Sequence, residues 1–341
     1  MRNSRLAAIT LGALTLSVCF FSPRLWLMRE YLPGTFEWDR AHSFLLQCEQ
    51  PFRRDVEVSV LWRLLPALIC HILGLRGWGA LCLPWLGAIC ATFYVARLHA
   101  NRLSEIRFVC GGTLLFATTA AVLVPVGWLG LNDGWMWLGL LAVAFADSGW
   151  TILVACVLCP WVDERFIIAL PLAMVVRHID RQAGVGRCIS AALPGLVLYA
   201  GIRLTFSAAV AGPTNHYLTE QLASIPVFIA WVPLGWWMGL RVAWLPVAGA
   251  VRSRPWLLGG GAFATIGICL LLATDLSRST AMLSPLMLLG VFQFAATRPD
   301  IAPRFVLRAG VANLLIPAAH ITFTKFDRID NLALELLRLR H

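Results

Sequence analysis

The chain has 341 residues, of which 59% are hydrophobic and only 13% are charged, and its formal net charge is +10. About a quarter of the residues in a soluble domain are charged, so this composition excludes an ordinary soluble protein and indicates a multi-pass membrane protein. The basic residues lie in short clusters between apolar runs, as membrane topology requires, and therefore do not indicate a nucleic-acid partner.

The apolar runs predict an all-α transmembrane bundle of about ten spans, because one span needs about 20 apolar residues. Residues 257–273 are apolar on every face, whereas the strands of a membrane barrel alternate between apolar and polar. We expect residues 1–318 to form the bundle. Residues 319–341 should form an amphipathic C-terminal tail, because their leucines fall on one helical face.

The N-terminal segment resembles an uncleaved membrane anchor. Arg2 and Arg5 precede an apolar core over residues 6–21, which places the N-terminus in the cytoplasm. Residues 23–61 then form an extracytoplasmic loop. The next apolar piece, residues 61–75, is short for a span, so it predicts an amphipathic helix in the outer interface.

The rest of the chain alternates between long and short apolar pieces. The pieces at 135–146, 149–161 and 166–176 are too short for full spans, so they predict re-entrant or broken helices that line a cavity inside the protein. The remaining spans are expected at 79–96, 108–126, 190–206, 223–248, 256–273, 280–296 and 305–318.

Charged and amide side chains concentrate in the segments that this topology places outside. Desolvating a charge at the centre of a membrane helix costs about 2.5 to 3.5 kcal/mol, so their convergence on one face suggests a shared polar cavity. Ordinary contact of loops with water explains part of the pattern and stays open as an alternative. The converging residues are Glu37, Asp39, Asp55, Glu57, Arg63, Asn132, Asp133, Asp163, Glu164, Arg165, Asn215, His216, Asp275 and Arg278.

The first outer loop contains a candidate catalytic pair, Glu37 and Asp39. Pro33 and Gly34 directly before it favour an extended backbone, in which both carboxylates point the same way. A carboxylate held against apolar walls acquires a raised pKa and can act as a general base toward a hydroxyl acceptor.

Other outer residues are candidates for binding the phosphate of a leaving group. Arginines suit this task because their bidentate hydrogen bonds strengthen as negative charge develops. The cofactor is unknown; a divalent cation shared by Asp163 and Glu164 with the first-loop acids remains open. The predicted substrate- and phosphate-binding residues are Arg63, Asp163, Glu164, Arg165, Asp275, Arg278 and His216, with Arg203 as a further arginine.

An acidic first outer loop, the interfacial helix in "WRLLPALICHILGL", short re-entrant pieces and an outward tail together resemble the GT-C superfamily of integral-membrane glycosyltransferases. The resemblance implies a polyprenyl-phosphate sugar as the donor and a catalytic Asp or Glu in the first extracytoplasmic loop. Asp39 would be the base and Glu37 its partner. The segments "DERF" and "DLSR" would contribute to the donor phosphate site.

The same resemblance implies a location in the inner membrane of a bacterium, with membrane lipids, a lipid-linked sugar donor and envelope-assembly proteins as partners. Two alternatives remain: a transporter or flippase, and a non-catalytic membrane subunit of polysaccharide or lipid assembly. A transporter would place charges along a mid-membrane pathway and show internal repeats, but few mid-span charges occur beyond Arg203 and Arg241.

Overall fold

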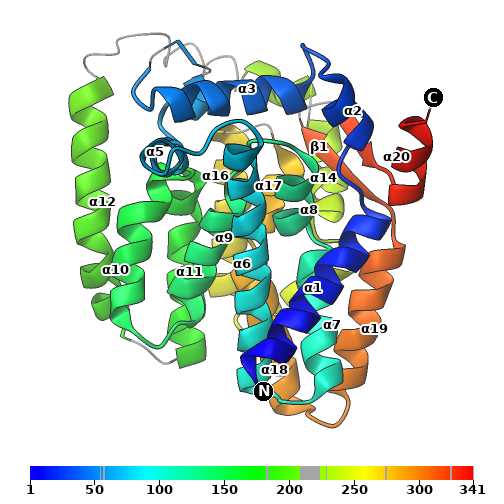
Figure 1. Cartoon of the computed structure of the whole chain (residues 1–341). Coiled ribbons are helices and arrows are strands. Elements are labelled where there is room, and N and C mark those ends of the chain that lie inside the picture. The colour runs from blue at the N-terminus through cyan, green and yellow to red at the C-terminus, as the bar shows by residue number, and fades with distance from the viewer. Residues whose placement is uncertain are drawn as a thin grey trace.

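A computed structural model of the chain describes residues 1–53, 55–56, 58–181, 184–207, 223–227, 229–272, 275–322 and 325–340. Helices make up most of these residues, which confirms the all-α class (Figure 1). The sequence did not predict the two-stranded antiparallel hairpin of β1 (Ala318–Thr322) and β2 (Lys325–Ile329), in which Ala318 pairs with Ile329.

Three of the described helices are long and apolar enough to cross a membrane: α1 (Asn3–Phe20), α6 (Trp78–Arg102) and α12 (Val185–Ser207). A fourth crossing is possible if α7 (Ile106–Ala117) and α8 (Ala120–Gly127) form one span, bent by 53°. These are fewer than the about ten spans predicted on the 20-residue rule. Much of the remaining apolar sequence forms helices shorter than a full span.

The three short apolar pieces form separate helices, as predicted. They are α9 (Asp133–Phe145), α10 (Gly149–Leu158), which η1 (Cys159–Trp161) extends, and α11 (Arg165–Arg181). Ser148 caps the N-terminus of α10, because its hydroxyl accepts a hydrogen bond from the backbone N–H of Trp150.

The span predicted over 223–248 is broken in the structure. Its described part consists of residues 223–227, η3 (Ile229–Trp231), α14 (Val232–Leu240), η4 (Arg241–Ala243) and α15 (Trp244–Ser253). Arg241, with a φ of 51°, ends α14 in a conformation that side chains rarely adopt. Its buried guanidinium fixes this break, because Nη1 donates to the carbonyl of Ile316 (2.9 Å) and the group lies 4.8 Å from the ring of Phe21.

The C-terminal half of the bundle continues with shorter helices. Two of the predicted spans also divide: residues 255–272 contain a π-helical turn before α16, and a short helix precedes α18. The helices are η5 (Pro255–Gly259), α16 (Gly260–Leu272), α17 (Leu276–Ala281), α18 (Ser284–Thr297) and α19 (Ala302–Leu315).

A layer of short elements lies across the end of the bundle opposite the N-terminus (Figure 1). We call it the α3 layer. The predicted interfacial helix is α5 (Leu64–Ile72), and the tail contains β2 and α20 (Leu332–Arg338) rather than one continuous helix. The first loop is mainly helical, and its longest helix crosses the end of the bundle. The other elements of this layer are α2 (Leu25–Glu30), α3 (Phe36–Glu49), α4 (Val58–Leu61) and β1.

Small residues set the close approach of helices beneath this layer. A Cβ atom on Gly134 of α9 would lie 2.3 Å from the backbone nitrogen of Ala88 in α6. Glycine at this position therefore lets the start of α9 sit directly against α6. Asp133, the first residue of α9, is fixed by this contact at the buried end of the bundle.

Candidate functional site

The ends of three helices bring buried charges together beneath the outer layer. Asp133 at the start of α9 accepts two hydrogen bonds from Arg278 of α17, at 2.6 Å from Nε and 2.8 Å from Nη2. Nη2 of Arg165, at the start of α11, lies 3.3 Å from the same carboxylate. All three side chains are buried, so Asp133 compensates two arginines that have little access to water.

Asp163 extends these contacts to the first loop. It accepts two hydrogen bonds from the side chain of Arg165, at 2.8 Å and 2.7 Å, and one from the backbone N–H of Arg165 at 3.0 Å. Nη2 of Arg63, directly before α5, lies 3.0 Å from Oδ2 of Asp163. Helix α5 is therefore tied to the segment before α11 by a nearly buried ion pair.

Asp275 extends the contacts in the other direction, toward the hairpin. Its carboxylate caps α17 by accepting the backbone N–H of Arg278, and it also pairs with Nη1 of Arg278 at 2.9 Å. Nε2 of His320 on β1 lies 3.0 Å from Oδ1 of Asp275, and the His320 ring packs edge-on against Trp128 with 4.6 Å between centroids.

We call Asp133, Asp163, Arg165, Asp275, Arg278 and Arg63 the buried ion network. Its three acids and three arginines balance in charge. Burial acts to raise the pKa of Asp163, but the charges of Arg165 and Arg63 outweigh it and hold that pKa well below its usual range. Burial likewise opposes ionisation of Asp275, and His320 and Arg278 overcome it and lower the pKa. Both acids are therefore ionised at neutral pH.

The network reaches the surface at Glu164, whose side chain is 32% exposed. Glu164 pairs with Nη1 of Arg203 at 2.9 Å and lies 3.8 Å from Nε of Arg63. Arg203 also donates to the hydroxyl of Tyr199 at 2.6 Å and stacks over the Trp62 ring at 4.8 Å. Two arginines, one carboxylate and two aromatic rings thus meet at one partly open position.

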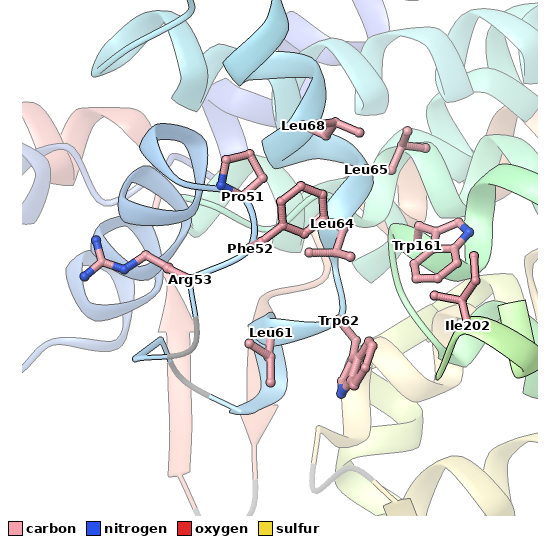
Figure 2. Close-up of a pocket in the computed structure, with 10 residues that line it drawn as sticks. All are labelled: Pro51, Phe52, Arg53, Leu61, Trp62, Leu64, Leu65, Leu68, Trp161 and Ile202. Carbon is pink, nitrogen blue, oxygen red and sulfur yellow. The ribbon is translucent and has the colours of Figure 1, made fainter. Parts of the chain in front are cut away.

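An apolar pocket of about 400 Å³ adjoins this position. Phe52, Trp62 and Trp161 come from three different segments and converge with leucines of α4 and α5 on one space, while the guanidinium of Arg53 points away (Figure 2). Arg63 and Arg203 directly follow the lining residues Trp62 and Ile202 in the sequence. An apolar pocket with cations at its edge can hold a chain with a charged head group. The other lining residues are Pro51, Leu61, Leu64, Leu65 and Leu68.

The structure separates the predicted catalytic pair. Glu37 and Asp39 lie in the first turn of α3, not in extended chain, so their side chains diverge instead of pointing the same way. Glu37 is buried and pairs with Nη1 of Arg24 at 2.8 Å. Asp39 is exposed, and its Oδ1 accepts the backbone N–H of Gly34 at 3.2 Å. The expectation of a shared direction is therefore wrong.

Glu37 is connected to the buried ion network through its partner Arg24. The guanidinium of its partner Arg24 lies 5.1 Å from the ring of Trp128, which packs against His320. Arg24 also lies 3.3 Å from Asp327 on β2. Arg24 thus links α3 with both the hairpin and the residues at the end of α8.

Among the predicted substrate-binding residues, the structure brings six into contact: Arg63, Asp163, Glu164, Arg165, Asp275 and Arg278. His216 lies outside the described residues. Arg165 and Arg278 point at buried aspartates, whereas Arg63 and Arg203 directly follow residues that line the pocket, and Arg203 stacks on the lining residue Trp62. Arg53 is the arginine that lines the pocket itself. Arg203, proposed from sequence only as an additional arginine, therefore has a position equal to that of Arg63.

Sequence reasoning gave no site role to three residues that the structure makes important. Asp133 was among the polar residues expected to converge on one face, but it was given no binding or catalytic role. His320 and Arg24 had no signal, because their partners lie 45 and 13 residues away in the sequence.

The acids do not form a shared cation site. Glu37 faces Arg24 and Asp163 faces Arg165 and Arg63, so neither carboxylate is directed at the other. Within the described ranges, no group of three or more His, Cys, Asp or Glu residues is arranged to hold a metal ion.

No protein-family model, curated protein or solved structure matches this chain. The site geometry and the sequence are therefore the basis for a functional proposal.

Proposed function

We propose that the chain is a multi-pass membrane glycosyltransferase of the GT-C kind, which transfers a sugar from a lipid-phosphate donor to an acceptor on the extracytoplasmic face. The observation that carries the proposal is the apolar pocket that adjoins Arg63 and Arg203. A polyprenyl phosphate has matching chemistry, because a long apolar chain ends in an anion that guanidinium groups bind well.

In this proposal the lipid chain lies against Trp62, Trp161 and the leucines of α5, while the phosphate contacts Arg63 and Arg203. Glu164 now pairs with Arg203 at 2.9 Å and lies 3.8 Å from Nε of Arg63, beyond hydrogen-bond distance. Because Glu164 is partly exposed, a phosphate can replace it as the partner at little desolvation cost. Two positive charges would stabilise the phosphate as the sugar leaves.

The other members of the buried ion network position Arg63 rather than binding substrate themselves. Asp163 holds the guanidinium of Arg63 from the buried side, and Arg165 orients Asp163 through two hydrogen bonds. In this proposal the buried charges serve to position Arg63, which accounts for the many desolvated ionised side chains at this end of the bundle.

Asp39 is the proposed general base, by the resemblance to GT-C enzymes. It is an exposed carboxylate in the first outer loop, held through Gly34 at the start of α3. In the proposed topology, short helices combine in series so that the chain crosses a bacterial inner membrane about ten times. The α3 layer then lies on the extracytoplasmic side.

Binding of undecaprenyl phosphate to the purified full-length chain in nanodiscs tests the pocket. Replacing Arg63 by Gln should weaken binding about tenfold, since a charged hydrogen bond contributes about 1.5–3 kcal/mol. Arg252→Gln is the matched control, because Arg252 is exposed and does not line the pocket. Unchanged binding by the Arg63→Gln variant would contradict the proposal.

A second candidate function is a lipid-binding subunit or flippase without transferase activity. It is favoured by the ion pairing of Glu37, which leaves that carboxylate unavailable as a base partner. Incubating the purified chain with a polyprenyl-phosphate sugar and an acceptor distinguishes the two functions. A transferase releases polyprenyl phosphate, whereas a subunit or flippase binds the donor without cleaving it.

A further inference from the structure

A second cavity, of about 780 Å³, lies at the end of the bundle opposite the α3 layer. It is enclosed by the end of α9, the last turns of α11 and the start of α12, whose lower ends lie together in Figure 1. The lining includes Asp147, Arg177, Arg181, Gly184, Gly186 and Arg187.

Two of its arginines are held by the end of α9. Buried Arg177 donates to the carbonyls of Val143 at 2.9 Å and Asp147 at 3.4 Å. Arg181 donates to the carbonyl of Phe145 at 2.7 Å. Because these are carbonyls at a helix C-terminus, the arginines are oriented before any ligand arrives.

The charge of the lining favours an anion. Three arginines face a single carboxylate, Asp147, which pairs with Nη1 of Arg181 at 2.6 Å. The nearby carboxylate of Asp180 is shared, because Arg102 pairs with it as well as Nε of Arg181 at 3.3 Å. The lining thus keeps a net charge of +2, from three arginines minus one aspartate.

The backbone at the start of α12 adds a second anion-binding element. The N-terminus of this 23-residue helix carries the positive end of its dipole. A Cβ atom on Gly184 or Gly186 would meet nothing within 4 Å, so both glycines leave room for a ligand to approach the main chain. Arg187 follows within the first turn and is exposed.

We propose that this cavity binds a phosphate group through Arg181, Arg187 and the N-terminus of α12. Guanidinium forks and helix N-termini are both suited to phosphate oxygens. The phosphate belongs either to the head group of an anionic lipid or to a small phosphate compound from the aqueous phase. The site lies at the opposite end of the bundle from Arg63 and Arg203 and does not depend on transferase activity.

Thermal unfolding of the full-length chain in neutral detergent tests the proposal, with three additions at equal ionic strength. These are dioleoyl-phosphatidylglycerol, dioleoyl-phosphatidylcholine and inorganic phosphate. We expect a saturable rise in Tm with phosphatidylglycerol or with phosphate, and none with phosphatidylcholine. A rise with phosphatidylglycerol alone identifies the lipid source, and a rise with inorganic phosphate identifies a soluble one.

Arg181→Gln combined with Arg187→Gln should raise the half-saturating concentration about tenfold or more. The matched control is Arg252→Gln with Arg254→Gln, which removes the same charge from exposed arginines outside the cavity. Arg187→Gln alone covers the case in which the loss of Arg181 impairs folding. Equal effects in the control pair, or no selective rise in the unaltered chain, would overturn the proposal.

Discussion

Nη2 of Arg63 lies 3.0 Å from Oδ2 of Asp163, which joins the start of α5 to the segment before α11. This contact requires the first loop and the "DERF" segment to lie at the same end of the bundle. The interfacial helix is thereby connected directly to the buried ion network. Arg63 is also the member of that network closest in sequence to the apolar pocket.

This contact requires both segments to lie on the same side of a membrane, and the proposed function places that side outside. Cysteines introduced at Asp39 and Glu164 should react with a membrane-impermeant maleimide added from outside intact cells, because Asp39 is exposed on α3 and the Glu164 side chain is 32% exposed. A cysteine at Arg298 should react only after permeabilisation, since it lies in a basic loop at the other end. Labelling of positions 39 and 164 from opposite sides would contradict the contact.

The apolar runs predicted the positions of most helices and the breaks between residues 135 and 176, but not the break within residues 223–248. The end of α14 depends on the buried guanidinium of Arg241 and its bond to Ile316, a tertiary contact between residues 75 positions apart. The direction of the Glu37 carboxylate likewise depends on Arg24. Local turn signals at Pro33 and Gly34 favoured extended chain, but helix α3 begins just after them and redirects both acids.

The site was predicted in outline because charge is costly in an apolar chain, so isolated acids and arginines indicate partners. That argument found Asp163, Arg165 and Arg278 but could not assign pairs. Whether an arginine faces a buried aspartate or an open pocket depends on packing, which separates Arg278 from Arg203 in the structure.

Asp133 should be essential for stability. Replacing it by Asn leaves Arg165 and Arg278 with less compensation in a buried position, so the free energy of unfolding should fall by about 3–5 kcal/mol. Asp300→Asn is the control, because Asp300 is exposed in the turn before α19 and its loss should change stability by about 0.5 kcal/mol or less. Denaturation in detergent measures both. Similar stability of the two variants would show that the buried pairs contribute little.

The two acids of α3 should separate catalysis from folding. Asp39→Asn should lower turnover of a polyprenyl-phosphate sugar about 100-fold or more while leaving Tm unchanged, because Asp39 is exposed and makes one backbone contact. Glu37→Gln should lower Tm, since it removes the charged partner of Arg24. Donor cleavage and thermal unfolding measured on the same preparations distinguish these effects. Full turnover by the Asp39→Asn variant would remove that residue from the mechanism.

Protonation of Asp163 and Asp275 should destabilise the protein only at low pH. The folded state lowers the pKa values of Asp163 and Asp275 below the unfolded value of 3.8, so their stabilisation is complete above that value. It is lost as pH falls toward the folded-state pKa values. The contribution of these two acids to Tm should therefore stay nearly constant from about pH 5 to 8 and fall below about pH 4. An Asp275→Asn variant should show a shallower fall, and an equally steep one would exclude Asp275 as a contributor.

The central claim is that the pocket beside Trp62 holds the lipid chain of a phosphate-bearing donor. The most direct measurement is photocrosslinking of the full-length chain in nanodiscs with a diazirine-bearing polyprenyl phosphate, followed by peptide mapping. The account predicts labels on Phe52, Trp62, Leu65 and Trp161, all competed away by unlabelled polyprenyl phosphate and reduced by Arg63→Gln. Uncompeted labels on exposed apolar residues such as Trp256 and Phe263, with none in the pocket, would contradict it.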